Sequence, residues 1–345
     1  MLFFVLGLPG QHTNWCTEVL RSILEREGRA TNIVHIDNIQ SLAVELTKSE
    51  SDNTVVLMHR LDRALLETLS EVRKTVLLVS SNPLRGFFHF RHFADFSDLE
   101  AARHVMSSCA SIISLIQQGV GNFIDTENFL RTPEIGIRQI ANAFGKNLGD
   151  ADIAEIYAHT KGLLQSAYDD SDGGGFPLQL LKDQTKKDFV QAMEFSVIQY
   201  DRALKSGSLD RIAVVRDFFV TGDAPHRPVV EPIDVTGLAR CLFFGPYVNL
   251  PVGSWAMNLA LSFSEGCVGV PFKIEITAEA DQHVEHLGTL TVQISTAGRH
   301  DFGMNFDTTN PKATIEVRIF NEKAVFDGHL SLGFADFKRR NRVHV

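Results

Sequence analysis

The chain has 345 residues, a hydrophobic content of 44%, a charged content of 22% and a formal net charge of −9 at pH 7. This balance is typical of a globular protein that is long enough for two domains, each with its own core. The negative charge argues against a broad nucleic-acid surface. No apolar stretch approaches the ~20 residues that cross a bilayer, so we expect no membrane span.

The start of the chain lacks a basic segment and soon reaches Gly7 and Pro9, so it does not read as a signal peptide. The 4 cysteines are widely spaced and form no C-x-x-C pair, which indicates reduced thiols rather than a zinc or redox motif. We therefore expect a cytoplasmic protein. The basic cluster Lys338–Arg342 predicts a solvated tail rather than a contact with glycan, membrane or RNA.

Apolar runs alternate with segments of helical periodicity over the first ~145 residues. This alternation predicts a parallel sheet with helices on both faces, and the glycine turn after the first strand makes the expected fold class a P-loop-type sheet flanked by helices. The expected strands are Phe3–Leu6, Thr31–Ile36, Thr54–Met58, Lys74–Val79 and Phe123-Ile124, and the expected helices are Thr13–Leu24, Ile39–Leu46, Arg63–Val72, Leu99–Gln117 and Pro133–Phe144.

The stretch Asp169–Gly175 has the strongest loop composition in the chain. Its acidic residues suggest calcium, but the ligand spacing and closing Glu of an EF-hand are absent, which favours a mobile surface loop. A helix is expected over Asp188–Leu204.

Short segments with turn signals follow from about residue 212, which predicts an antiparallel β-sandwich. We expect residues 1–206 to form the α/β domain and 207–345 the sandwich. The expected strands are Ile212–Phe219, Cys241–Phe244, Trp255–Phe263, Phe272–Ala278, Gly288–Ser295, Ala313–Phe320 and His329–Phe334.

The first strand breaks at Gly7-Leu8-Pro9-Gly10 and a helix follows. A strand, a glycine turn and a helix N-terminus form an anion-binding geometry, because free N–H groups and the helix dipole point at the ligand. A phosphate loop usually adds a Lys or Arg. Here Gly10, Gln11 and His12 occupy those positions.

This loop resembles the G-x-P-[KR]-[ST]-G-T-T-W motif of the sulfotransferase superfamily, whose members transfer a sulfuryl group from 3′-phosphoadenosine-5′-phosphosulfate (PAPS). Gly7, Pro9, Thr13 and Trp15 match, whereas Gly10 stands where the basic residue belongs. The resemblance implies that a nucleotide would lie against Gly7, Pro9, Gly10, Gln11, His12, Thr13 and Asn14.

A second segment, Val79–Phe90, resembles the family's 3′-phosphate segment V-x-R-N-P-x-D-x-x-x-S. Asn82 and Pro83 match, while Ser81, Arg85 and His89 replace the arginine, the acid and the serine. The implied nucleotide contacts here are Asn82, Arg85 and His89, and Arg85 or Arg91 could supply a displaced charge.

A third segment resembles the structural Y-E-[DN]-L…P…I…F-L-G stretch of the family and supports the fold rather than the chemistry. Its residues in register are Glu127, Asn128, Pro133, Ile140, Phe144 and Gly145. In addition, Leu57-Met58-His59 resembles the K-[ST]-H tripeptide whose His is the general base, which makes His59 the candidate catalytic residue. The alternative is a capping or surface histidine.

The loss of charge or hydroxyl at Gly10, Ser81 and His89 predicts a degenerate cofactor site. Each charge-assisted phosphate bond is worth roughly 1.5–3 kcal/mol, so PAPS binding should be weaker by orders of magnitude. We therefore expect no cofactor, or PAPS if the protein is an active sulfotransferase.

The second domain contains Gly245–Trp255, which resembles the GPY-x-x-L-P-x-G-x-[YW] turn of carbohydrate-binding-like β-sandwiches. Tyr247 and Trp255 are the candidate glycan ligands, and the alternative is that both are core aromatics. His283, Glu285 and His286 lie on an expected polar loop, but no third metal partner is defined, so no metal is expected.

The leading hypothesis is a degenerate sulfotransferase-like protein of bacterial surface-polysaccharide synthesis or modification that recognises glycan. One alternative is an active sulfotransferase that modifies a glycan hydroxyl with His59 as general base. The other is a non-enzymatic assembly protein whose partners are glycan-synthesis proteins. Whether the chain is an enzyme stays open.

Overall fold

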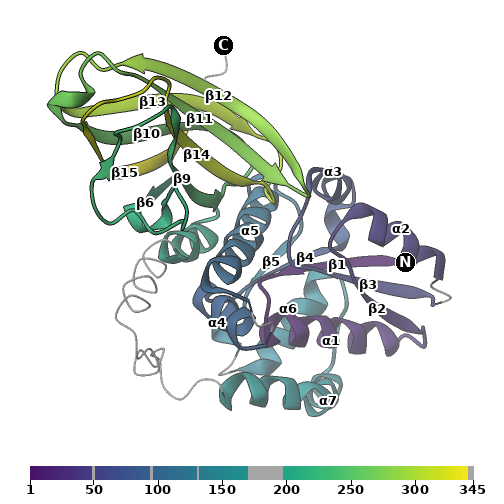
Figure 1. Ribbon diagram of the computed structural model, residues 1–345. Helices are drawn as coiled ribbons and strands as arrows, with labels where there is room; N and C mark the ends of the chain where they lie inside the picture. The colour runs from purple at the N-terminus through teal and green to yellow at the C-terminus, as the bar shows by residue number, and fades with distance from the viewer. Residues whose placement is uncertain (49–50, 94–95, 130–131, 170–196, 341–345) are drawn as a thin grey trace. The chain divides into compact units, whose positions relative to one another are not determined.

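The structure is a computed structural model that describes residues 1–48, 51–93, 96–129, 132–169 and 197–340. The chain divides into two compact units. Unit 1 is Met1–Gln184 with Tyr200–Ser208, and unit 2 is Thr185–Gln199 with Leu209–Val345. Figure 1 shows parallel strands with helices in unit 1 and antiparallel strands in unit 2.

Unit 1 contains a five-stranded sheet of order β2-β3-β1-β4-β5, in which every pair is parallel. Its three central strands are buried along their whole length or nearly so, because helices cover both faces of the sheet. The strands are β1 (Leu2–Gly7), β2 (Thr31–His35), β3 (Asn53–Met58), β4 (Val76–Ser80) and β5 (Asn122–Asp125).

Helices α1, α6 and α7 share one buried core with the sheet, and α5 lies against its other face (Figure 1). The adjacent strands β1 and β4 therefore lead into helices on opposite faces, which makes their carboxyl ends the topological switch point of the sheet. The helices are α1 (Gln11–Glu25), α2 (Ile39–Lys48), α3 (Arg63–Glu71), α4 (Pro83–Phe93), α5 (Asp98–Gln117), α6 (Pro133–Ala143) and α7 (Asp150–Asp169).

The predicted P-loop-type parallel sheet with flanking helices is confirmed, with small shifts at element ends. Helices α4 and α7 were not predicted. Residues 197–206 are helical, in agreement with the end of the helix expected over Asp188–Leu204. The rest of that helix, and the loop predicted over Asp169–Gly175 beyond its first residue, lie outside the described residues.

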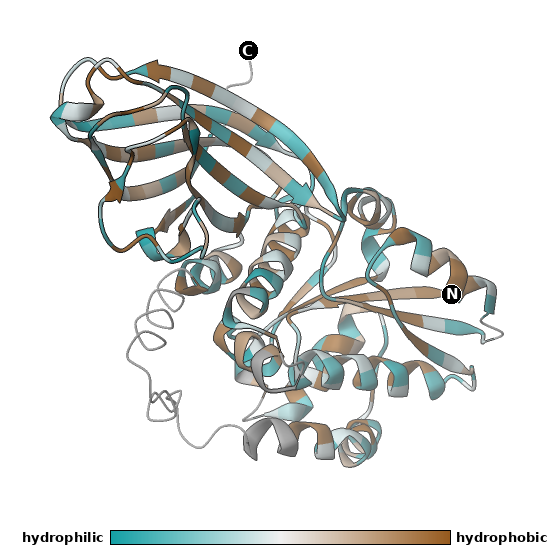
Figure 2. Ribbon diagram, viewed as in Figure 1, coloured by the Kyte–Doolittle hydropathy of each residue, from teal (hydrophilic) through white to brown (hydrophobic). Residues whose placement is uncertain are grey.

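Unit 2 contains two antiparallel sheets, of order β13-β10-β15-β6 with β8 beside β15, and β12-β11-β14-β9-β7. The rings of Phe263 and Phe272, one from each sheet, have centroids 4.8 Å apart, so the two sheets pack face to face. The predicted β-sandwich is confirmed, and apolar and polar residues alternate along its long strands (Figure 2). The strands are β6 (Arg211–Val214), β7 (Val220–Thr221), β8 (Ile233–Asp234), β9 (Arg240–Asn249), β10 (Gly253–Phe263), β11 (Pro271–Ala280), β12 (His283–Gln293), β13 (Gly298–Thr308), β14 (Thr314–Asn321) and β15 (His329–Arg339).

Two expectations for unit 2 are wrong. Strand β15 continues through Arg339, so the start of the predicted tail is paired with β10 and β6. His283, Glu285 and His286 lie within strand β12 rather than on a loop. The stretch Gly245–Trp255 does contain a turn, which lies between the end of β9 at Asn249 and the start of β10 at Gly253.

The edge strand β6 is closed by a side chain. Gln199 donates from Nε2 to the Ala213 carbonyl at 2.9 Å and accepts from the Ala213 N–H at 2.8 Å. Both open backbone groups of Ala213 are thereby satisfied, which removes a template for edge-to-edge pairing.

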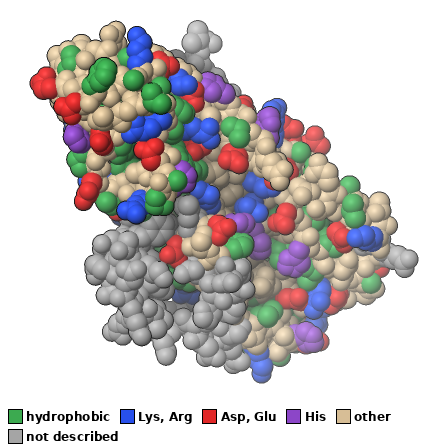
Figure 3. Space-filling model, in the orientation of Figure 1, with side chains coloured by type: hydrophobic (Ala, Val, Ile, Leu, Met, Phe, Trp, Pro, Cys, Tyr) green, Lys and Arg blue, Asp and Glu red, His purple; other side chains and the backbone are tan. Residues whose placement is uncertain are grey.

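The described residues include no helix that is long and apolar enough to cross a membrane. All four cysteines are free thiols. On the face in view in Figure 3, the Lys and Arg side chains of the described residues are interspersed with Asp and Glu.

Two helical glycines of unit 1 should respond in opposite ways to replacement by alanine. A Cβ on Gly136 of α6 would lie 2.8 Å from the Phe129 ring and 3.0 Å from Trp15, whereas a Cβ on Gly162 of α7 would meet nothing within 4 Å. We expect Gly162→Ala to stabilise unit 1 by up to about 1 kcal/mol, from helix propensity alone. Gly136→Ala should destabilise it, because overpacking costs roughly 1–3 kcal/mol. Denaturant unfolding of both variants tests this, and equal stabilisation by both would contradict the packing.

Candidate functional site

The turn from β1 into α1 has no room for a side chain at Gly7. A Cβ there would lie 2.4 Å from Thr13 Oγ1. Thr13 is fully buried, and its hydroxyl donates to the carbonyl of Leu8 at 2.5 Å. The Thr13 hydroxyl is thus used inside the loop, and only its backbone remains as a ligand group.

Gly10 occupies the position of the missing cation, and its backbone explains why a cation is absent. It is the N-cap of α1 with φ 138° and ψ 179°, a conformation that is essentially restricted to glycine. The space beside it is open, since a Cβ would meet nothing within 4 Å. A lysine or arginine at this position would therefore be disfavoured by the backbone conformation and not by steric crowding.

The start of α1 is left without a polar cap. The N-cap residue Gly10 has no side chain that could accept from the first N–H groups of the helix, and the first turn contains no acidic residue. The backbone of Pro9 is approached closely by α4, because a Cβ on Gly86 would lie 3.4 Å from the Pro9 carbonyl oxygen. Gln11 is half-buried, and its Oε1 has no hydrogen-bond partner among the described residues. Asn14 donates its N–H to the Gly10 carbonyl at 3.3 Å.

His12 is buried and holds Arg85 beside the loop. The Thr126 hydroxyl donates its proton to the Ser80 carbonyl at 2.8 Å. Thr126 Oγ1 therefore accepts from His12 Nδ1, which lies 2.9 Å away. His12 Nε2 then accepts from Arg85 Nη1 at 3.2 Å. Burial, and then the Arg85 charge, lower the pKa of His12 to about 4. His12 is therefore neutral at pH 7, and Arg85 provides the cation from α4. The side chain of Arg91 lies outside what the structure describes.

Asn82 has a structural task that the motif alone did not reveal. Its Oδ1 accepts from the Leu84 N–H at 2.9 Å and so starts α4, while its own N–H donates to Glu127 at 3.1 Å. This pair joins the ends of β4 and β5. His89 lies on α4, half-buried, with its ring 6.3 Å from that of Phe90.

His59 is oriented by the loop itself. Its Nδ1 lies 2.9 Å from the Gly7 carbonyl oxygen, which can only accept, so Nδ1 carries the proton and Nε2 is the basic atom. Burial lowers the pKa of His59, His35 and His89 add to the effect, and Asp37 and the Gly7 bond oppose it. The group is thus a neutral base at pH 7.

Tyr247 is re-aimed by a bulge in β9. Ile315 pairs with Val248 and Glu316 with Pro246, so Tyr247 is an extra residue, and its φ of 61° is unusual for a side-chain-bearing residue. Its ring stands edge-on to Phe244, with centroids 6.1 Å apart.

Trp255 is not a candidate ligand. It is 0% exposed and its Nε1 donates to the Pro251 carbonyl at 3.0 Å. The expectation that Trp255 stacks on a sugar is wrong, because its strand directs it into the sandwich core.

Polar groups surround the two aromatic rings on the outward side of the β12-β11-β14-β9-β7 sheet, which we call the β9 face. Arg318 donates from Nε and Nη2 to Glu316 at 2.9 and 2.6 Å. Thr277 Oγ1 is buried without a hydrogen-bond partner among the described residues. The β9 face comprises Phe244, Tyr247, Lys273, Glu275, Thr277, Glu316, Arg318 and Phe320.

Among the described residues, no group of three or more His, Cys, Asp or Glu side chains is placed to hold a metal ion. His286, one of the three residues weighed for metal, bonds Thr289 instead, at 2.7 Å.

No protein-family model matches the chain, and no curated protein matches it. The N-terminal part is similar to a mouse sulfotransferase, SULT7A1, solved with PAP, at 16% identity over 59% of this chain and 87% of that chain, with a TM-score of 0.43. The C-terminal part is similar to the module TmCBM61, solved with β-1,4-galactotriose, at 8% identity over 38% and 83% of the two chains, with a TM-score of 0.25.

A third similar structure is the carbohydrate binding module of Cellvibrio mixtus lichenase 5A, solved with cellotriose. It is 13% identical over 35% of this chain and 85% of that chain, with a TM-score of 0.22. At these scores, what this chain does has to be judged from its own residues.

The neutral state of His12 predicts acid sensitivity of unit 1. The folded-state pKa of about 4 lies below the usual imidazole pKa of 6.5, so this stabilisation is present above pH 6.5 and is lost as the pH falls toward 4. The loss for this one group is about 3 kcal/mol. We expect denaturant unfolding of His12→Gln to depend less on pH in that window. His159→Gln, on the exposed side of α7, is the control, and identical pH profiles for the two variants would contradict the role of His12.

Proposed function

We propose that this protein recognises glycan through the β9 face of unit 2. The observation that carries the proposal is Tyr247, which a bulge and a φ of 61° direct onto the outward side of the sheet beside Phe244. Non-glycine residues in this conformation are costly and occur often at ligand clamps. An aromatic ring on a half-exposed surface offers a flat partner for the C–H side of a sugar ring.

The neighbouring side chains suit the hydroxyl groups of a sugar. Arg318 and Glu316 are planar, charged and fixed to each other. Lys273 is likewise fixed, 2.9 Å from Glu275 and 4.6 Å from the centre of the Phe320 ring. The buried Thr277 hydroxyl adds a group that still requires a partner. Because the charges occur in pairs, the face favours a neutral sugar chain.

In this proposal unit 1 is a degenerate sulfotransferase-like domain, and the whole chain acts in the synthesis or modification of a bacterial surface polysaccharide. The conformation of Gly10 and the internal use of the Thr13 hydroxyl support weak nucleotide binding. The domain boundary near residue 206, the cytoplasmic location and the lack of a cofactor belong to the same proposal.

Replacement of Tyr247 by alanine should weaken glycan binding about tenfold, because an aromatic contact is worth roughly 0.5–1.5 kcal/mol beyond its buried area. The measurement is a glycan array followed by titration calorimetry with the strongest sugar. Phe326→Ala is the matched control, since Phe326 is 96% exposed on the same unit. Unchanged binding by Tyr247→Ala would overturn the assignment. No sugar binding together with capture of a glycan-synthesis protein would favour an assembly role.

A second candidate, sulfuryl transfer to a glycan hydroxyl, is favoured by His59. Its Nδ1 is fixed on Gly7, which leaves Nε2 to accept the hydroxyl proton. Arg85 would compensate the charge that Gly10 cannot carry, at the uncapped start of α1. The donor would be PAPS, against the loop Gly7–Asn14 with Asn82 and His89 nearby.

Calorimetry with PAP and PAPS separates the two candidates. Micromolar binding would overturn the degenerate site and favour transfer. In that case His59→Ala should abolish transfer without loss of the fold, whereas His159→Ala should leave it unchanged. Because the pKa of His59 is lowered, the rate should fall, through protonation of this base, only at a pH below the usual imidazole pKa of about 6.5. Full activity of His59→Ala would reject its role as base.

A further inference from the structure

Strand β15 has a gap in its pairing on one edge. On that side β8 pairs with His329–Leu330 and β6 pairs with Ala335–Lys338. In the described part of the chain no strand pairs with the residues between them on this side. The gap arises because β6 ends at Val214 and the chain turns away, while Gly333 forms a bulge in β15. A Cβ on Gly333 would lie 3.3 Å from the Ala260 carbonyl oxygen.

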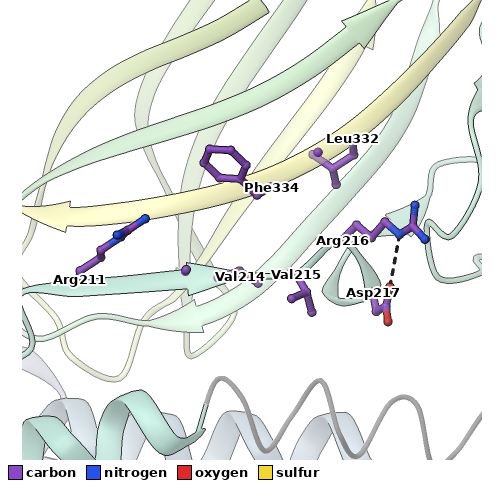
Figure 4. Close-up of a pocket in the computed structure, with 9 residues that line it drawn as sticks. Arg211, Val214, Val215, Arg216, Asp217, Leu332 and Phe334 are labelled. Carbon is purple, nitrogen blue, oxygen red and sulfur yellow. Dashed lines mark ion pairs between the residues drawn. The ribbon is translucent and has the colours of Figure 1, made fainter. Parts of the chain in front are cut away.

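This gap forms an open pocket of about 620 Å³ in unit 2 (Figure 4). Backbone groups of β15 border it together with apolar, aromatic and charged side chains, which is the mixture that orients a small polar ligand. Its lining residues are Arg211, Ala213, Val214, Val215, Arg216, Asp217, Leu332, Gly333 and Phe334.

Two arginines stand at the ends of the pocket in Figure 4, with Phe334 between them. Arg211 uses Nε for Asp336, at 2.7 Å, and Asp336 is only 2% exposed, so the guanidinium is anchored and its two Nη groups can still donate. Arg216 is only loosely paired, with Nε 3.9 Å from Asp217. Each arginine therefore has one acidic partner, and Arg216 has the more available guanidinium because its pair is the longer of the two.

The aromatic ring between the arginines is accessible. Phe334 is 37% exposed, and Arg299 Cζ lies 5.6 Å from its ring centroid. A sugar ring can pack its C–H side on such a surface while its acid group reaches an arginine fork.

We propose that this pocket binds the acid group, a carboxylate or a sulfate ester, of a sugar residue in a glycan. The proposal rests on glycan recognition by unit 2, and it adds an acidic substrate class at a second place on that unit. A sugar acid is favoured over an acidic peptide because the exposed Phe334 ring lies between the two arginines and gives the C–H side of a sugar ring a surface to pack on.

The test uses the full chain at low salt with three tetrasaccharide probes: oligogalacturonate, chondroitin sulfate and neutral β-1,4-galactotetraose. We expect both acidic probes to bind about tenfold or more tightly than the neutral one, as one charge-assisted bond would produce. Arg216→Gln should lower the affinity for the acidic probes about tenfold and leave the affinity for the neutral probe unchanged. Lys323→Gln makes the same charge change at an exposed site outside the pocket lining and should change none of them.

A second variant guards against a folding effect. Arg211→Lys keeps a charge for the buried Asp336 but removes the guanidinium fork, so the preference for acid should weaken while the melting temperature is retained. Comparison of the chondroitin sulfate tetrasaccharide with its desulfated form, which keeps the uronate carboxylates, identifies the carboxylate or the sulfate ester as the preferred group.

Equal binding of acidic and neutral probes, or an acid preference that survives Arg216→Gln, would overturn the inference and leave glycan recognition at the β9 face intact. Failure of the acidic sugars together with the absence of any hit on the glycan array would overturn both proposals. Binding of a hexaglutamate peptide that depends on Arg216, without binding of acidic sugars, would replace the sugar by a peptide.

Discussion

The close approach of the chain at Gly7 positions the whole candidate site of unit 1. Its missing side chain lets Thr13 pack against the strand end, which sets where α1 begins. Its carbonyl oxygen fixes the tautomer and direction of His59. One residue thereby links the turn between β1 and α1 to the candidate base His59, and any side chain at this position would displace both.

The charge of the site has moved between elements. The resemblance placed a cation in the loop, yet the backbone at Gly10 excludes one. The structure supplies Arg85 from α4 instead and holds it with a buried neutral histidine, His12. A cation on α4 is not equivalent to a cation in the loop, because it would approach a ligand from another direction. The loop therefore keeps its strand, glycine turn and helix start, while the cation beside it comes from α4.

Unit 2 obtains its candidate sites from irregularities in otherwise regular strands. A bulge in β9 turns Tyr247 outward, and a bulge in β15 opens the pocket beside Phe334. A regular ladder alternates its side chains strictly and closes its edges, so it offers neither feature. The ion pairs differ between the two places as well, since those of the β9 face are 2.6–2.9 Å long, whereas Arg216 of the pocket lies 3.9 Å from Asp217.

The two fold classes could be predicted from the amino-acid sequence alone, because buried parallel strands are continuous apolar runs and sandwich strands alternate, and both patterns are local. It also indicated the loop, His59 and Tyr247 as candidates. It missed α4, whose start depends on the Asn82 side chain and on contact between Gly86 and the loop, and it misplaced Trp255, whose direction depends on strand register. The contact between Arg85 and His12, 73 residues apart, and the gap in the edge of β15 emerged only from the folded structure. Contacts between distant segments depend on packing, register and bulges, which no local pattern of residues encodes.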